Sequence, residues 1–489
     1  MRGILGSSPS LATEVTICLE RIASSDCRET LSSSAGVLSA DQPIATGSRG
    51  LHVAFDGALY NTEQLLRDHR LDVSSFDGAE VVLALFQLLG PSFTDHLEGA
   101  YAFIIIDDTE GTLFFGVDEM GIKPLYLSRY ADGVLLCSTL AALPLDRISD
   151  VERVPCGTVW DLDGLRHTTG RVTSDTEWTT ALRKALQAQI PQDIRWCSLL
   201  SGGVDSSVLC SLAAQQGPLM TLTCGMDGSE DLEQGRRVAE LLDSEHHEHR
   251  IDPDQLKSMI HEVVIATASF EPWLVLGGIG TLAAARAGAA LGVKAMISGE
   301  GADELFAGYR DFDHTPAETL EATLRDQQNQ LGATECLRLD RCSRAAGVEV
   351  RVPFLAREVV AAVRALPVGA KRNRPGSPDS ITKVALREYA SQLGLPEWVA
   401  YRAKVGFSKG IGITPTLTDF AHDERSRWAS PADRERYAAP GIDMDAPVAA
   451  WLLGLWLSHY GDALGSDWTS LEERGLVRAT AQSLMERSG

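Results

Sequence analysis

The stretch Leu199-Leu200-Ser201-Gly202-Gly203-Val204-Asp205-Ser206-Ser207 decides the fold of this chain. Apolar residues from Ile194 to Leu200 predict a short strand, and Val204 to Gln215 predicts a helix, so two glycines form the turn between them. Glycine lets the backbone approach an anion closely, and the helix start offers free N–H groups and the positive end of its dipole. The sequence therefore predicts a phosphate-binding loop, in which further hydroxyl donors come from Ser201, Ser206 and Ser207.

Asp205 indicates which ligand this loop takes. A carboxylate beside phosphate is repelled unless a divalent cation lies between them, so Asp205 predicts a bridging Mg²⁺. The loop is not a Walker A motif, because no Gly-Lys-Ser/Thr follows its glycines. The alternative is a glycine-rich turn in which Asp205 only starts the helix.

Strands and helices alternate on the C-terminal side of the loop, which predicts a parallel sheet covered on both faces. The expected elements there are a strand at 220–224, a helix at 231–242, a helix at 279–290 and a strand at 292–298. The first 165 residues contain short strands separated by turns and one helix at 79–89, which predicts an antiparallel α+β domain. From about residue 315 the chain is expected to be mostly helical.

Composition excludes several classes of function. The 489 residues carry 44 Lys and Arg against 67 Asp and Glu, a formal charge of −23 that disfavours nucleic-acid binding. No stretch of 18 or more uncharged apolar residues predicts a membrane span, and Met1 to Ser10 does not resemble a secretory signal. The nine cysteines form no CxxC pair, which fits reduced thiols in a cytoplasmic enzyme.

Several motifs resemble one enzyme family. Ser201 to Ser207 resembles the pyrophosphatase loop of the ATP pyrophosphatase superfamily, and Ser298 to Tyr309 resembles the SGEGxDE(L/I)FxGY segment of asparagine synthetases. Lys383 lies in a K-x-x-LR segment, and Arg402 to Ser408 resembles a segment shared by asparagine and β-lactam synthetases. The resemblance implies an αββα Ntn-hydrolase-like domain over 1–170, similar to class II glutaminases. An α/β ATP pyrophosphatase domain with a helical C-terminal part would follow over 171–489.

The resemblance also implies site residues, with ATP and Mg²⁺ as ligands. Asp205 and Asp303 would hold the metal, Lys383 and Lys404 would neutralise the departing pyrophosphate, and Glu300 would hold or deprotonate the incoming amine. The nucleotide would be lined by Leu200, Ser201, Gly202, Gly203, Asp205, Ser206, Ser207, Cys224, Ser298 and Gly299. For each lysine the alternative is a solvated surface cation, and for Glu300 it is a plain ion-pair partner.

The N-terminal domain departs from the family where glutamine would be hydrolysed. The family's nucleophile is a cysteine at position 2, but here Arg2 stands there, and guanidinium cannot replace a thiolate. Asp56 replaces the usual Asn before Gly57, and Gly78 stands where the family carries an Asp. We therefore expect no glutaminase activity and a structural role for this domain. Cys18 and Cys27 are the alternative nucleophiles, but for each we favour core packing or a free thiol.

The acid substrate is also expected to differ from aspartate. The family's E-T-(Y/F)-D…R pattern is missing from Ala266 to Gly277, where Trp273, Leu274 and Leu276 predict a more apolar pocket. Simple core packing of this run is the alternative.

Together these features predict an AMP-forming ligase that joins a carboxylic acid to ammonia or another amine, as in antibiotic biosynthesis. Its expected partners are small molecules and neither nucleic acid nor membrane, with a homodimer left open. The alternatives are a β-lactam or macrolactam cyclase, an ammonia-dependent asparagine synthetase, a sulfur-inserting ATP pyrophosphatase and a non-catalytic scaffold.

Overall fold

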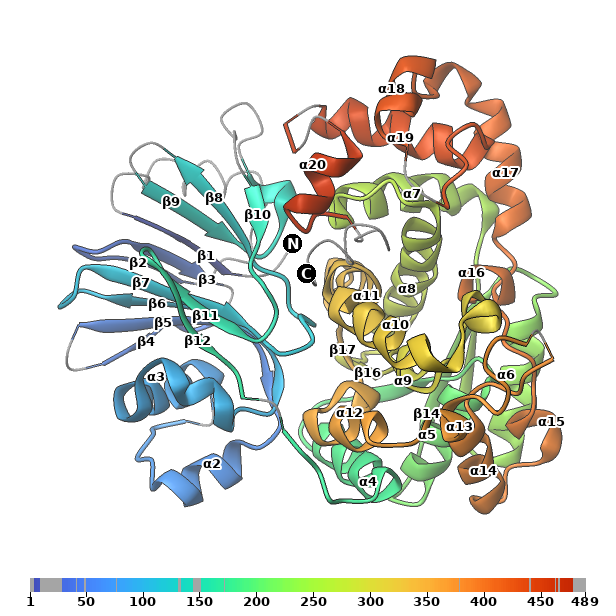
Figure 1. Cartoon of the computed structure of the whole chain (residues 1–489), viewed down its shortest axis with the longest axis horizontal. Coiled ribbons are helices and arrows are strands. Elements are labelled where there is room, and N and C mark those ends of the chain that lie inside the picture. The colour runs from blue at the N-terminus through green and yellow to red at the C-terminus, as the bar shows by residue number, and fades with distance from the viewer. Residues whose placement is uncertain are drawn as a thin grey trace.

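The computed structural model describes residues 4–8, 29–40, 42–47, 50–75, 77–130, 133–143, 151–170, 172–377, 379–438, 441–461, 463–464 and 467–477. Two parts lie side by side, a β-rich sandwich formed by the N-terminal residues and a larger α/β part (Figure 1). Arg2, Cys18 and Cys27 lie outside the described residues.

The N-terminal part contains two antiparallel sheets of six strands each. In spatial order, sheet A consists of β10 (Val151–Arg153), β8 (Tyr126–Tyr130), β9 (Gly133–Cys137), β1 (Ile4–Ser7), β3 (Val37–Ala40) and β2 (Glu29–Ser32). Sheet B consists of β12 (Gly164–Thr168), β11 (Thr158–Asp161), β7 (Thr112–Val117), β6 (Gly99–Asp107), β5 (Leu51–Leu59) and β4 (Ala45–Thr46). Among the described residues of this part, the helical elements are α2 (Thr62–His69), α3 (Gly78–Leu89), η2 (Gly90–His96) and η3 (Leu140–Ala142).

Strand β6 shows why the sheets stack in this way. Its side chains alternate between two cores, because successive residues of a strand point to opposite faces. Ile104 and Ile106 pack toward sheet A, whereas Phe103 and Ile105 pack under α3. Both faces are buried, so β6 is apolar almost throughout.

The C-terminal part is built on a five-stranded parallel sheet, as the alternation of strands and helices predicts. Sheet C consists of β15 (Glu245–Arg250), β14 (Met220–Gly225), β13 (Trp196–Leu199), β16 (Ala295–Ile297) and β17 (Glu349–Arg351). Its principal helices are α4 (Trp178–Gln189), α5 (Val204–Ala214), α6 (Glu230–Leu241), α7 (Pro253–Thr267), α8 (Pro272–Ala290) and α11 (Glu335–Ala345). The predicted phosphate loop follows β13 and the Ser298 segment follows β16, so both lie at the carboxyl edge of the sheet, where α/β folds bind ligands.

The remaining elements confirm the expected helical C-terminal part. They are α9 (Ala302–Phe306), η4 (Arg310–His314), α10 (Ala317–Gln330), η5 (Leu331–Ala333), η6 (Pro353–Leu355), α12 (Arg357–Arg364), α13 (Val368–Lys371), α14 (Val384–Gln392), α15 (Glu397–Ala400), α16 (Phe407–Gly410), α17 (Thr414–Asp423), η7 (Arg425–Arg427), α18 (Pro431–Arg436), α19 (Pro447–Tyr460) and α20 (Trp468–Glu473).

Helix α8 and strand β15 are among the elements that differ from the sequence-based expectation. Helix α8 begins at Pro272 rather than Ile279, because proline is favoured in a first helical turn and the glycines after it are tolerated in a buried helix. Strand β15 was not expected, because its sequence Glu-His-His-Glu-His-Arg is polar, as an exposed edge strand allows. Helix α8 is long and apolar enough to cross a membrane, but 72% of its apolar window is buried within the protein, as in a core helix.

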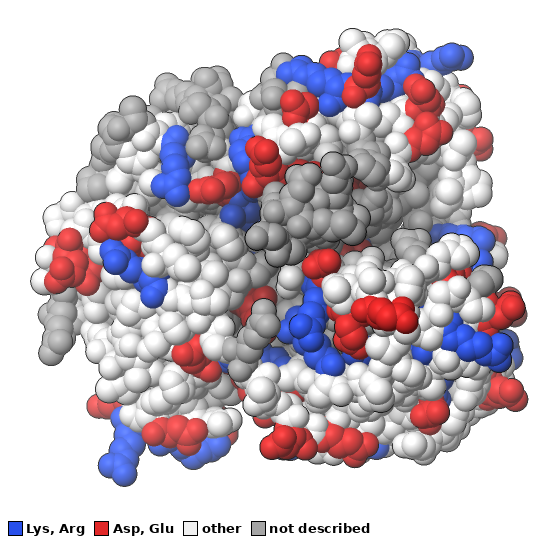
Figure 2. Space-filling model, in the orientation of Figure 1, with Lys and Arg blue, Asp and Glu red and all other residues white. Residues whose placement is uncertain are grey.

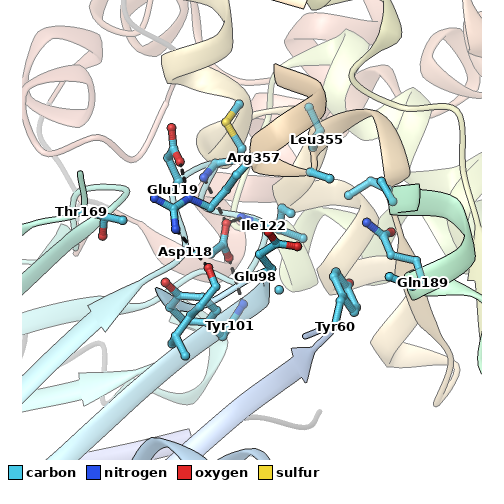
Figure 3. A pocket seen from close by; sticks show the side chains of 17 residues that line it. Tyr60, Glu98, Tyr101, Asp118, Glu119, Ile122, Thr169, Gln189, Leu355 and Arg357 are labelled. Carbon is cyan, nitrogen blue, oxygen red and sulfur yellow. Dashed lines mark hydrogen bonds and ion pairs between the residues drawn. The ribbon is translucent and has the colours of Figure 1, made fainter. Parts of the chain in front are cut away.

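Arg357 ties the two parts together. The guanidinium of this α12 residue donates to the backbone oxygens of Asp95 (2.9 Å), Leu97 (3.3 Å) and Gly170 (2.7 Å) and to the carboxylate of Glu119 (3.1 Å). Arg357 is among the residues, drawn in Figure 3, that line a small cavity between the parts. The volume of this cavity is about 30 Å³. On the face of the molecule in Figure 2, acidic and basic side chains are interspersed.

Candidate active site

A cavity of about 310 Å³ opens at the carboxyl edge of sheet C. Twelve of the predicted site residues line it: Leu200, Ser201, Gly203, Asp205, Ser206, Cys224, Ser298, Gly299, Glu300, Asp303, Lys383 and Lys404. Gly202 and Ser207 do not. Gly202 has φ +71°, a conformation that glycine adopts without strain, and Ser207 is fully buried. The structure thus brings together segments that are up to about 200 residues apart in the sequence.

The phosphate loop is closed by its own serines. Ser206 Oγ lies 3.2 Å from Ser201 Oγ and donates to the carbonyl of Gly203 at 3.2 Å, while Gly203 N donates to Ser201 Oγ at 3.3 Å. Gly299 faces this loop so closely that a Cβ there would lie 3.1 Å from Asp205 Cβ. These contacts hold the loop together where the start of α5 meets the cavity.

Two lysines and two aspartates alternate at the centre of the site. Lys383 Nζ lies 2.6 Å from Asp205 Oδ2 and 2.7 Å from Asp303 Oδ1, and Lys404 Nζ lies 2.5 Å from Asp303 Oδ2. Lys383 is buried and starts α14 with φ +56°, a conformation that few non-glycine residues adopt. Gly308 leaves the space they need, because a side chain there would clash with both Lys383 and Asp303.

This arrangement fixes the charges of the site. Burial alone would raise the pKa of Asp303, but the ammonium groups of Lys383 and Lys404 outweigh burial and lower it to about 2. Burial would likewise lower the pKa of Lys404, yet Asp303 and Asp205 raise it above its usual range. At neutral pH both groups are ionised.

The two aspartates fit a divalent cation. Carboxylate oxygens of Asp205 and Asp303 both lie within 2.7 Å of Lys383 Nζ. The two carboxylates are therefore close enough together for one small cation to contact both. Two carboxylates completed by phosphate oxygens are the ligand set that Mg²⁺ prefers.

Arg402 connects the lysine-bearing segment to the phosphate loop, a contact that sequence analysis missed. Its guanidinium donates to the Ser201 carbonyl at 2.7 Å and pairs with Glu230 at 2.8 Å and Asp231 at 3.2 Å. Burial raises the pKa of Asp231 to about 6 against the opposing effect of Arg402. The position of Arg402 two residues before Lys404 was visible in the sequence, but its partners were not.

The far end of the cavity contains an acidic cluster with one arginine. Glu300 Oε1 accepts from Arg338 Nη2 at 2.8 Å, and Glu335 lines the cavity beside them. Burial raises the pKa of Glu335, and nearby Glu300 adds to the shift. Glu304 accepts a hydrogen bond from Tyr309 Oη at 2.5 Å, and its pKa is also raised by burial and by the charge of Glu335. Glu335 and Arg338 were not predicted, and only their spacing on one face of a helix could have indicated them.

One wall of the cavity is formed by α8. Trp273, Gly277 and Thr281 line it at spacings of four residues, which place them on one face of the helix. Leu274 and Leu276 are buried and do not line the cavity, so of the three residues predicted to form an apolar pocket only Trp273 does. Phe407 adds a second aromatic wall, with the Arg338 guanidinium 5.8 Å from its ring centroid.

The departures in the N-terminal part have structural counterparts. Asp56 is completely buried and forms an ion pair with Arg344 of α11, from the other part of the chain. At Gly78 there is no room for an aspartate, because its Cβ would lie 2.6 Å from Cδ1 of Phe55. Asp56 is thus engaged in a contact within the protein, and Gly78 packs against the ring of Phe55.

Comparisons with known proteins agree with this architecture. The family model described as asparagine synthase matches residues 177–330 and 316–442, and that of a glutamine amidotransferase domain matches residues 29–144. Glutamine-hydrolyzing asparagine synthetase 3 of Arabidopsis thaliana is 31% identical over 411 residues, covering 77% of this chain and 70% of the relative. Glutamine-hydrolyzing asparagine synthetase B of Escherichia coli (strain K12) is 29% identical over 422 residues, covering 79% and 75%. Among solved structures, an NMN synthetase from Francisella tularensis aligns with 63% of this chain and 99% of its own at 13% identity, with a TM-score of 0.29.

Proposed function

Because this chain belongs to the asparagine synthase family, whose members are ATP-dependent ligases that form carbon–nitrogen bonds, we propose that it joins a carboxylic acid other than aspartate to ammonia or another amine without using glutamine. The observation that carries this proposal is the continuity of the cavity. The same 310 Å³ space reaches from the phosphate loop and its lysines to Trp273, Glu300 and Arg338.

The first half-reaction is adenylation. A carboxylate oxygen of the acid attacks the α-phosphorus of ATP, and pyrophosphate leaves. Ser201 and Ser206 hold phosphate oxygens at the start of α5, while Lys383 and Lys404 offset the charge that develops on the leaving group. Asp205 and Asp303 would hold Mg²⁺, which neutralises phosphate charge when bound.

The second half-reaction is acyl transfer. The amine nitrogen attacks the acyl carbon, AMP leaves, and one proton is released from the nitrogen. Glu300 stands at the wall of the cavity where a carboxylate can hold the amine and take that proton. Arg338 fixes the direction of the Glu300 carboxylate.

Two observations support a changed substrate and donor. Trp273 and Phe407 give the cavity aromatic walls, which favour a larger or more apolar acid than aspartate, as expected for a natural-product ligase. The Asp56–Arg344 pair and the side chain of Phe55 beside Gly78 argue against glutamine binding in the N-terminal part.

The test is ATP–pyrophosphate exchange with a panel of carboxylic acids that includes aspartate, followed by mass analysis of the product formed with ammonium or amines. We expect exchange with apolar acids, weak exchange with aspartate, and amide formation that glutamine does not support. Ready exchange with aspartate would contradict the changed acid pocket. A product that loses water from one molecule would identify a cyclase, and absence of exchange with every acid would favour a scaffold.

A further inference from the structure

Helix α11 carries buried charges that face the N-terminal part. Asp340 Oδ1 accepts from Lys123 Nζ at 2.6 Å, Arg341 donates to the Ser138 carbonyl at 2.7 Å, and Arg344 pairs with Asp56. Asp340, Arg341, Lys123 and Asp56 are all at most 5% exposed. Figure 1 shows α11 on the side of the α/β part that faces the sandwich.

Such pairs fix the helix in position. Removing one partner of a buried ion pair leaves an unpaired charge, which is strongly unfavourable, so α11 cannot rotate or slide without breaking these contacts. Asp56 contributes directly, because its carboxylate is fully buried and its ion-pair partner, Arg344, belongs to α11.

The other end of the same helix reaches the active-site cavity. Glu335 and Arg338 line the cavity, and Arg338 donates to Glu300 at 2.8 Å and to Thr281 Oγ1 at 3.3 Å. From Glu335 to Arg344 an α-helix rises about 14 Å at roughly 1.5 Å per residue. One rigid element thus connects Asp56 to the residues around Glu300.

We propose that Asp56 is a positioning residue for acyl transfer, acting through Arg344 and α11 on the placement of Glu335 and Arg338. This gives the N-terminal part a defined task in the reaction: it holds a cavity-lining helix of the other part. The inference rests on the proposed function for what Glu335 and Arg338 contact, but the placement of α11 can be tested without any substrate.

The structural test is hydrogen–deuterium exchange of the full-length chain without ligand. In Asp56→Asn and in Arg344→Gln, backbone amides of residues 335–345 should exchange at least about tenfold faster than in wild type. The double variant should show no larger effect than either single one, because the two residues act as a pair. Glu152→Gln, which removes an exposed ion pair with Arg129 in the same part, is the matched control and should leave this peptide unchanged.

The catalytic test uses MgATP, pyrophosphate and ammonium with an acid that supports exchange in wild type. Asp56→Asn should slow amide formation at least about tenfold. The KM for ATP and the rate of ATP–pyrophosphate exchange should stay within about threefold of wild type, because the ATP-contacting loop lies on other elements. A general loss of structure would instead change all three together.

Two results would overturn the proposal. One is unchanged hydrogen–deuterium exchange of residues 335–345 in both single variants, and the other is amide formation by Asp56→Asn at the wild-type rate. If both variants fail to fold, Arg344→Lys is measured in the same way. It keeps the charge but loses the fork of guanidinium donors, so it should show a smaller rise in hydrogen–deuterium exchange of 335–345 and a smaller loss of amide formation, and wild-type values for both would overturn the proposal. Failure of the proposed function would appear separately, because the wild-type protein would then show no ATP–pyrophosphate exchange with any acid.

Discussion

Lys383 Nζ lies 2.6 Å from Asp205 Oδ2, although the two residues are 178 positions apart in the sequence. The same nitrogen also contacts Asp303, so one buried ammonium separates two carboxylates that would otherwise repel each other. This relationship implies that the apo site is kept together by a lysine at the point where a divalent cation would be shared.

Replacing Lys383 with Gln should therefore make stability depend on Mg²⁺. Loss of a buried ion-pair partner should cost about 3–5 kcal/mol in unfolding free energy. Added MgCl₂ should recover part of the loss in thermal melting, because the cation replaces the missing charge. Lys371→Gln is the matched control, a buried lysine paired with Glu321 outside the cavity. Equal responses of the two variants to Mg²⁺ would contradict the shared cation site.

Replacing Lys404 with Met should lower ATP–pyrophosphate exchange by about 10²–10³-fold, the loss typical of removing one group that stabilises developing negative charge. Lys409→Met, five residues further along and exposed, serves as the control and should retain wild-type exchange. If Lys404→Met exchanged normally, its role would be limited to its ion pair with Asp303.

ATP affinity should weaken as the pH falls through about 6. Burial raises the pKa of Asp231 to about 6, so below that pH the carboxyl takes up a proton and its ion pair with Arg402 is lost. Arg402 then holds the Ser201 carbonyl and the Lys404 segment less firmly. Binding of a fluorescent ATP analogue between pH 5 and 8 measures this, and Asp231→Asn should remove the pH dependence. A variant with the wild-type pH profile would exclude Asp231 as its origin.

Adding one methyl group at Gly277 should impair acyl transfer. A Cβ there would lie 2.8 Å from Arg338 Nε, so Gly277→Ala has to displace Arg338 from Glu300. Amide formation should fall at least about tenfold. Gly288→Ala, on the same helix with no atom nearer than 3.4 Å, gains the same helix propensity without the clash. Similar rates in the two variants would show that Arg338 can shift without consequence.

Arg2→Cys should not create a glutaminase. A thiol at position 2 would supply the missing nucleophile, but Asp56 remains paired with Arg344 and Phe55 fills the space beside Gly78. Glutamate release from glutamine should stay at background for both wild type and variant. Release by the variant alone would locate the defect entirely at position 2.

Local sequence patterns predicted the parallel sheet and the strand, glycine turn and helix start of the phosphate loop, because these features are encoded by neighbouring residues. Motif resemblance added the Ser298 segment, Lys383 and Lys404, and the structure places all three at the cavity. Glu335 and Arg338 could not be predicted, because their proximity to Glu300 depends on how α11 packs against α8. The Asp56–Arg344 pair was hidden for the same reason, since the two residues come from different parts of the chain and meet only where those parts pack together.

The interface of α11 has a consequence for dissecting the protein. A fragment lacking the residues before Trp178 would lose Asp56, Lys123 and the Ser138 carbonyl together, and would leave Asp340, Arg341 and Arg344 without these partners. We therefore expect the ligase half to fold poorly on its own, and gene truncation to yield aggregated or misfolded material rather than a minimal enzyme.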